Sequence, residues 1–138
     1  MLHAFNVHFA VSLPLLATVL SILFFITKKD FLWKSSTIVL IFGAIAAAIA
    51  FFTGNSDGDL IYEFLTKKGQ DALTEHYDFV FYVLPVLFIT MLVKIYACYK
   101  KNIKIEMIGL GLLILSSILI IYQGRLGGLL VYSEGMMK

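Results

Sequence analysis

The sequence predicts an all-α membrane protein, a four-helix transmembrane bundle, and two observations lead to this fold class. The 138 residues are 60% hydrophobic with a mean hydropathy of +0.92, whereas a soluble domain is about half apolar. Four apolar stretches approach the roughly 20 residues with which a helix crosses a hydrocarbon core. We therefore expect a single integral membrane domain over residues 1–138, in contact with the lipid bilayer.

The expected membrane-spanning segments cover residues 7–27, 35–53, 79–97 and 105–122. The first ends in the charged run ITKKDFLWK and lacks the small-residue cleavage site of a secretory signal, so we expect it to remain in the mature protein. The second contains GAIAAAIA, which offers a small face for close packing. Cys98 is the single cysteine, so no intramolecular disulfide is expected.

Charge predicts the orientation of these segments. The connection after the first span holds three lysines and one aspartate, and we count Lys94 and Glu106 with the lysine-rich connection after the third span. The connection between the second and third spans holds six acidic residues and two lysines. Because Lys and Arg concentrate on the cytoplasmic side, both basic connections are expected inside. This predicts a multi-pass protein of a bacterial inner membrane with periplasmic N and C termini.

The acidic outer connection is long and its pattern favours a short amphipathic helix of its own. Ser56 or Asp57 is the expected cap and Gly69 the expected end. Its apolar residues recur at helical spacing: Leu60, Ile61, Phe64 and Leu65. We expect this helix to lie on the outer membrane surface, over the bundle.

Several function classes are disfavoured by the composition. The net charge of +2 is accounted for by anionic lipid head groups, so we expect no nucleic-acid partner. No charged residue lies in the middle of an expected span, which disfavours an ion carrier or proton pump. No hydroxyl or thiol nucleophile has an evident base beside it, so we expect no independent catalytic activity.

The two halves of the chain also share a faint pattern. His8 precedes LPLL, and His76 precedes LPVL with an offset of three residues. The second span ends in FFTGNSDG and the fourth in IYQGRLGG. These observations suggest a two-plus-two parallel repeat, although chance explains them nearly as well.

Three histidines, all on the predicted outer side, are the chemical signal of the sequence. His3 and His8 are five residues apart, which separates their directions on a helix by roughly 140°. With a first helix that starts near Phe5 or Asn6, His3 lies on an irregular segment. We therefore predict His8 and His76 as the two axial ligands of a b-type haem, with His3 as an accessory group.

The remaining parts of a haem pocket can be drawn from nearby residues. The expected ring-lining residues are Phe9, Tyr77, Phe79 and Phe51. Arg125, with the backbone of Gly124, Gly127 and Gly128, is the expected partner of a propionate. Because these groups lie in the outer leaflet of a core about 30 Å thick, one copy cannot carry electrons across it. We expect electron transfer with a quinol or a periplasmic redox partner, or redox sensing, and a homodimer is compatible with either.

Two alternatives remain open. A Zn, Cu or Fe ion is one, held by His3, His8 and His76 with Glu75 or Glu134 as an oxygen ligand, although the chain lacks a tight motif such as HExxH. A non-catalytic membrane scaffold subunit is the other, in which the histidines only bond to head groups or loop carbonyls.

The ordered segments LHAFNVHFAVSLPLL, FFTGNSDGD, LTEHYDF and GRLGGLLVYSEGM resemble an uncharacterised family of bacterial four-helix membrane proteins, the domain of unknown function 2231. The resemblance covers nearly the whole chain and implies an inner-membrane bundle, similar by analogy to cytochrome-b-like bundles, with histidines in the first motif and before the third helix. This chain has Ala4 where the family pattern suggests proline, and Glu134 where it often shows histidine. A fourth histidine ligand is therefore missing.

Overall fold

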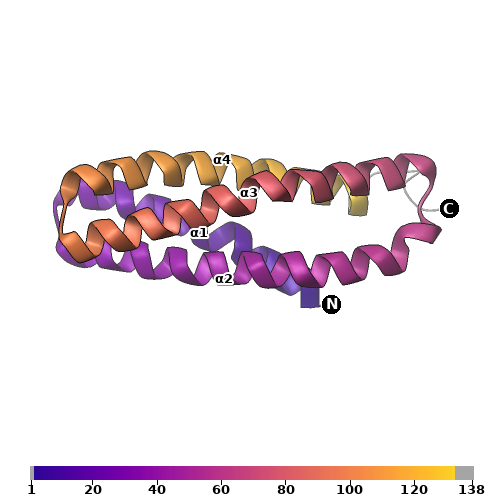
Figure 1. Ribbon diagram of the computed structural model, residues 1–138, viewed down its shortest axis with the longest axis horizontal. Helices are drawn as coiled ribbons and strands as arrows, with labels where there is room; N and C mark the ends of the chain where they lie inside the picture. The colour runs from indigo at the N-terminus through magenta and orange to yellow at the C-terminus, as the bar shows by residue number, and fades with distance from the viewer. Residues whose placement is uncertain (1, 133–138) are drawn as a thin grey trace.

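Four long helices form an up-and-down bundle in the computed structural model, which describes residues 2–132 (Figure 1). The elements in chain order are α1 (Leu2–Thr27), α2 (Asp30–Ile61), the 3₁₀ turn η1 (Tyr62–Phe64), α3 (Lys67–Lys100) and α4 (Ile103–Tyr132). Each α-helix is long and apolar enough to cross a membrane. The predicted fold class, a four-helix membrane bundle, is confirmed.

The second and third helices, α2 and α3, are longer than a membrane crossing requires. α2 has 32 residues and α3 has 34, which correspond to about 50 Å at 1.5 Å per residue, against a core of about 30 Å. Figure 1 shows the end of α2 and the start of α3 extending past α1 and α4. This extension, which we call the overhang, places the α2–α3 connection away from the other helix ends.

The expected amphipathic helix in that connection is not a separate element. Ser56 and Asp57 lie inside α2, which continues to Ile61, and Gly69 lies in the first turn of α3. The hydroxyl of Ser56 donates to the carbonyl of Phe52 instead of capping a new helix. In this connection the helical structure is interrupted only at Leu65 and Thr66. Thr66 caps α3, because its hydroxyl oxygen accepts a hydrogen bond from the N–H of Gly69 at 3.2 Å.

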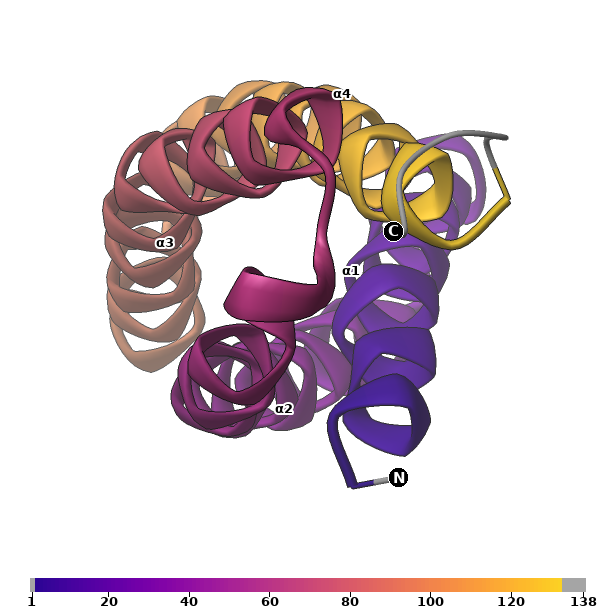
Figure 2. The ribbon, with the colours of Figure 1, turned by 90° about the vertical axis from the view of Figure 1, so that its right-hand side faces the viewer.

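The helices form a ring in which each packs on its sequence neighbours and α1 closes onto α4 (Figure 2). α1 with α2 and α3 with α4 are the two closely packed hairpins. The middle of the ring is filled by apolar side chains, among them Ala17, Leu40, Leu87 and Leu113, one from each helix and each fully buried. An apolar layer therefore separates the two ends of the bundle.

The two hairpins repeat one another with a shift of 73 positions. α1 ends at Thr27 and α3 at Lys100; α2 begins at Asp30 and α4 at Ile103. Among the described non-glycine residues only Lys28 and Lys101, also 73 apart (101 minus 28), have positive φ, at 57° and 49°. The α1–α2 and α3–α4 turns therefore have the same length and the same left-handed residue, and we call them the inner turns after the predicted orientation.

Burial follows the same shift, which changes the register suggested by the sequence. Five buried residues of α1 correspond to five buried residues of α3: Ala10, Pro14, Ala17, Ser21 and Phe24 with Val83, Leu87, Thr90, Lys94 and Ala97. The shift pairs His76 with His3, whereas the sequence comparison had paired it with His8. The prolines do not correspond, since Pro14 and Pro85 are 71 positions apart (85 minus 14).

Candidate functional site

His3 is held against α2 at the end of the bundle that carries the α2–α3 connection, which we call the outer end after the predicted orientation. Its Nδ1 lies 2.8 Å from the carbonyl oxygen of Ala50, and because a carbonyl only accepts, this nitrogen donates. The neutral ring then keeps its lone pair on Nε2. The ring rests on Gly54, where an added Cβ would be 2.5 Å from His3 Cε1. A glycine is therefore needed at position 54 for His3 to lie there.

His76 occupies the corresponding place in the second hairpin. The ring rests on Gly127 of α4, where an added Cβ would be 3.1 Å from its Cε1. The side-chain amide of Gln123 donates to the backbone carbonyl of His76 at 2.9 Å and lies 3.3 and 3.4 Å from the two ring nitrogens. Like His3, His76 is partly buried.

His8 is placed differently from the expectation. The sequence interpretation left His3 on an irregular segment, but α1 already begins at Leu2, so His3 and His8 lie on one continuous helix. Five residues turn a helix by about 140° beyond a full turn. Because the side of α1 that carries His3 packs against α2, His8 points in another direction and is exposed. The structure thus places His3 and His76 at partly buried positions and His8 at an exposed one, which gives no support to the expected axial pair of His8 and His76.

The other expected pocket residues fall into two groups. Tyr77 contacts Phe51 and Phe81, with ring centroids 5.9 and 5.8 Å apart, and Phe79 contacts Tyr122 at 4.8 Å. Tyr77 and Phe79 both follow His76 within one turn of α3. The second group is exposed: Phe9 (43% exposed), Arg125 and Glu75.

The metal-ion alternative is not assembled in the part of the chain that the structure describes. Within residues 2–132, no group of three or more His, Cys, Asp and Glu side chains is close enough to hold an ion. His8 and Glu75 are both exposed, and Glu134 lies outside the described residues. The described side chains expected to hold a Zn, Cu or Fe ion therefore do not come together at one point.

A buried ion pair lies at the other end of the bundle, and the sequence interpretation missed it. Lys94 of α3 and Glu106 of α4 form a salt bridge with both side chains 0% exposed. Ser21 of α1 accepts from Lys94 Nζ at 2.9 Å and donates to Glu106 Oε1 at 2.9 Å. Ionisable groups inside a membrane bundle are costly and often functional.

Counting Lys94 and Glu106 with the inner connection was therefore wrong. Lys94 lies six residues before the end of α3 and Glu106 three residues after the start of α4, so both belong to helices and face the interior. The available signal was that both residues fall within the expected spans 79–97 and 105–122. Both residues lie near one end of their helices, so the expectation that no charged residue occupies the middle of a span is unaffected.

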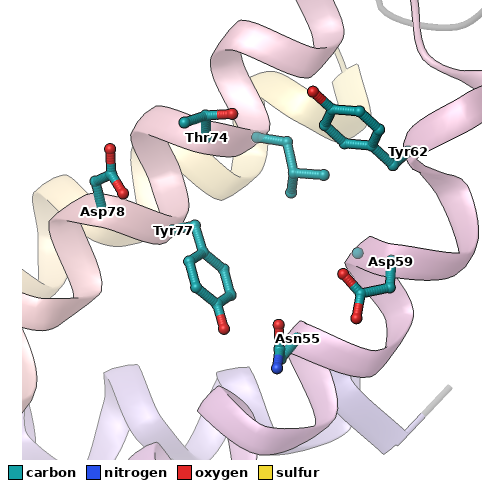
Figure 3. A pocket seen from close by; sticks show the side chains of 8 residues that line it. Asn55, Asp59, Tyr62, Thr74, Tyr77 and Asp78 are labelled. Carbon is teal, nitrogen blue, oxygen red and sulfur yellow. The ribbon is translucent and has the colours of Figure 1, made fainter.

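A pocket of about 180 Å³ lies in the overhang (Figure 3). Its lining comes from the end of α2, η1 and the start of α3: Asn55, Gly58, Asp59, Tyr62, Leu73, Thr74, Tyr77 and Asp78. Tyr77 links this pocket to the aromatic group beside His76. The pocket is open, so it resembles a surface cleft more than a cofactor cavity.

A family model described as a predicted membrane protein (DUF2231) matches residues 1–138. The chain belongs to this family. No curated protein and no solved structure matches it. The DUF2231 description states a membrane location and no activity, so the functional interpretation of this DUF2231 bundle rests on its partly buried histidines and its buried ion pair.

Proposed function

We propose that the protein binds one b-type haem at its outer end through His3 and His76 and exchanges electrons there with a quinol or a periplasmic partner. The observation that carries the proposal is the hydrogen bond from His3 Nδ1 to the carbonyl of Ala50. Histidines that bind metal usually donate their other ring N–H to a carbonyl or carboxylate, which fixes the ring and the tautomer. His3 is fixed in this way, with Nε2 left for a ligand.

Two histidines suit a haem better than a bare ion. Haem iron already has four nitrogen ligands from the porphyrin, so one or two protein side chains complete it. A Zn or Cu ion needs three or four protein ligands, and the described residues offer no such group. His3 and His76 come from different hairpins, as axial ligands on facing helices do in other bundles.

The surroundings of the histidines fit a flat apolar ligand. Gly54 and Gly127 let each imidazole lie against a neighbouring helix, and Phe51, Tyr77 and Phe81 form an aromatic group next to them. Arg125 is exposed on α4 two residues before Gly127, where its guanidinium is available to a propionate at the aqueous edge.

The position of the site limits what it does. A bound haem supplies one-electron redox chemistry, and the chain holds it at the outer end only. The inner end carries the Lys94–Glu106 pair rather than a second pair of histidines. We therefore propose electron exchange or redox sensing at the periplasmic face, not electron transfer across the membrane.

The absorption spectrum of the purified protein, expressed with excess haem, tests the proposal. We expect a Soret band and sharp reduced α and β bands that are lost in His3→Ala and in His76→Ala. His8→Ala is the matched control and should keep the full spectrum, because His8 is exposed. Bands that depend on His8 and not on His3 would restore the pair expected from the sequence. A colourless protein with stoichiometric metal would move the assignment to an ion.

A non-catalytic scaffold subunit is the second candidate. It is favoured by the hydrogen bonds that the histidines already make within the chain, to Ala50 and to Gln123. In that case the protein binds neither haem nor metal after haem-replete expression. His3→Ala and His76→Ala then lower stability without any spectroscopic change.

A further inference from the structure

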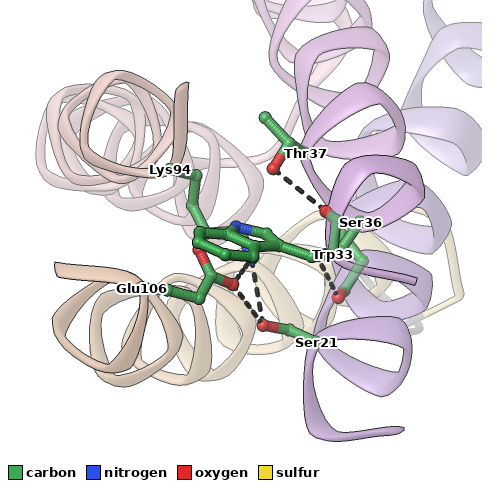
Figure 4. Close-up of polar contacts among 7 residues, drawn as sticks. Ser21, Trp33, Ser36, Thr37, Lys94 and Glu106 are labelled. Atoms are coloured by element: carbon green, nitrogen blue, oxygen red, sulfur yellow. Dashed lines mark hydrogen bonds and ion pairs between the residues drawn. The ribbon is translucent and has the colours of Figure 1, made fainter. Parts of the chain in front are cut away.

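One residue from each helix meets at the inner end of the bundle. Ser21 of α1, Trp33 of α2, Lys94 of α3 and Glu106 of α4 are all buried, with exposed fractions of 0%, 6%, 0% and 0%. We call these four residues the inner cluster (Figure 4). The Soret-band test does not involve them, so the inference drawn from them is independent of haem binding.

The hydrogen bonds of the inner cluster are incomplete. Glu106 Oε1 accepts from both Ser21 and Lys94, whereas Glu106 Oε2 has no partner. The indole Nε1 of Trp33 is also buried without a partner. An ammonium has three hydrogens, and Lys94 uses two of them, on Ser21 and Glu106. One acceptor and two donors are therefore left over in the same buried region.

The indole of Trp33 packs against the helix segments that carry the ion pair. Trp33 packs in an apolar cluster with Ala97, one helical turn from Lys94, and with Ile105, which directly precedes Glu106. The rings of Trp33 and Phe24 lie 5.0 Å apart, and Phe24 is one turn from Ser21. The indole is thus enclosed by the helices that carry the ion pair.

We propose that a water molecule binds inside the inner cluster, accepting hydrogen bonds from Trp33 Nε1 and Lys94 Nζ and donating one to Glu106 Oε2. Buried waters typically make about three hydrogen bonds to otherwise unsatisfied groups, which is the number offered here. Leaving a donor and a charged acceptor unpaired in a dry interior is unfavourable. The water also joins Trp33, and through it α2, to the polar contacts of the other three helices.

The chain has a single tryptophan, which makes the site directly observable. In a ¹⁵N–¹H NMR spectrum of the protein in lipid nanodiscs, the one indole N–H signal belongs to Trp33. We expect a nuclear Overhauser effect between this hydrogen and water, because the bound water lies against it.

The double variant Lys94→Met with Glu106→Leu removes two of the three partners of the water without leaving an unpaired charge. We expect the Overhauser effect to be lost and the indole signal to shift. Ser36→Ala is the matched control: Ser36 is equally buried but donates to the carbonyl of Ala17, outside the inner cluster. This variant should keep the effect.

Three outcomes would overturn the proposal. Absence of an indole–water effect in the unmodified protein, with a folded spectrum, means that the site is dry. An effect that survives in the double variant places the water elsewhere. A shift of the indole signal by the double variant without any water effect means that Trp33 bonds directly to Glu106.

Discussion

Gly54 and Gly127 are the residues that allow the two outer histidines to lie close against the neighbouring helices. The space at the two positions differs: an added Cβ would be 2.5 Å from His3 at position 54 and 3.1 Å from His76 at position 127. At Gly111 nothing lies within 4 Å. The three glycines therefore form a graded series in which only steric room changes.

We predict that Gly54→Ala destabilises the protein by about 1–3 kcal/mol, the usual cost of overpacking a core, and that Gly127→Ala costs less. Gly111→Ala is the control and should be neutral or stabilising by up to about 1 kcal/mol, because alanine is the better helix former. Unfolding in mixed detergent, followed by circular dichroism, measures all three. Equal stabilities for the Gly54 and Gly111 variants would mean that His3 moves aside freely.

The Lys94–Glu106 pair is the second feature at the scale of residues. Removing one partner leaves an unpaired charge in a buried site, so we predict that Lys94→Met or Glu106→Leu alone costs about 3–5 kcal/mol. The double variant should cost clearly less than the sum of the two. A double-mutant cycle on unfolding free energies measures this coupling. Additive losses would show that the two side chains act independently.

At the scale of elements, the two inner turns are equivalent. Lys28 and Lys101 both have left-handed backbone conformations, which cost a non-glycine residue roughly 1–2 kcal/mol. The N–H of Lys28 bonds to the carbonyl of Phe24 at 2.8 Å, and that of Lys101 bonds to Ala97 and Cys98. Both turns therefore end a helix with the same C-terminal geometry.

We predict that Lys28→Gly and Lys101→Gly each raise stability by up to about 1 kcal/mol, since glycine adopts this conformation without the Cβ clash. Lys29→Gly is the control. Lys29 has a φ of −80°, so glycine there relieves nothing and only adds freedom to the unfolded chain. Thermal unfolding of the three variants should separate the first two from the third. If Lys28→Gly behaves like Lys29→Gly, the left-handed turn is not a source of strain.

The helices were predictable from the sequence because each apolar stretch is long and bounded by charge, and both signals are local. The site was predictable only in part. His3 and His76 were among the named residues, but the choice between His3 and His8 depended on whether α1 begins at Leu2 or several residues later. The inward direction of Lys94 and Glu106 depends on how α3 and α4 rotate against each other. That rotation is fixed by packing across the bundle, which no local pattern reports.

At the scale of the whole molecule, the repeat explains how one chain makes two kinds of site. The shift of 73 positions matches His3 with His76 at the outer end, where both halves use the same residue type. At the inner end it matches Ser21 with Lys94 and Trp33 with Glu106, so a polar group and an indole face an ion pair. The outer end is nearly symmetric, with one histidine from each hairpin, whereas the inner cluster is asymmetric in charge.

The last prediction concerns the orientation of the whole bundle. Pairing Lys94 with Glu106 removes both from the charge count of the inner turns, yet the turns still hold lysines at 28, 29, 100 and 101. The overhang keeps its acidic residues. We therefore predict that both inner turns face the cytoplasm and that the overhang is periplasmic in a bacterial inner membrane.

Single cysteines in a Cys98→Ser background test this orientation. Asp57→Cys lies on the exposed overhang, and Lys29→Cys and Lys101→Cys lie at the exposed inner turns. A membrane-impermeant maleimide added to spheroplasts should label the first and leave the other two unlabelled until the cells are lysed. Labelling of both inner-turn cysteines in intact spheroplasts would show that the orientation is the opposite of the predicted one. Because the repeat places the two turns at the same end, they must behave alike in either case, and a difference between them would contradict the four-helix topology itself.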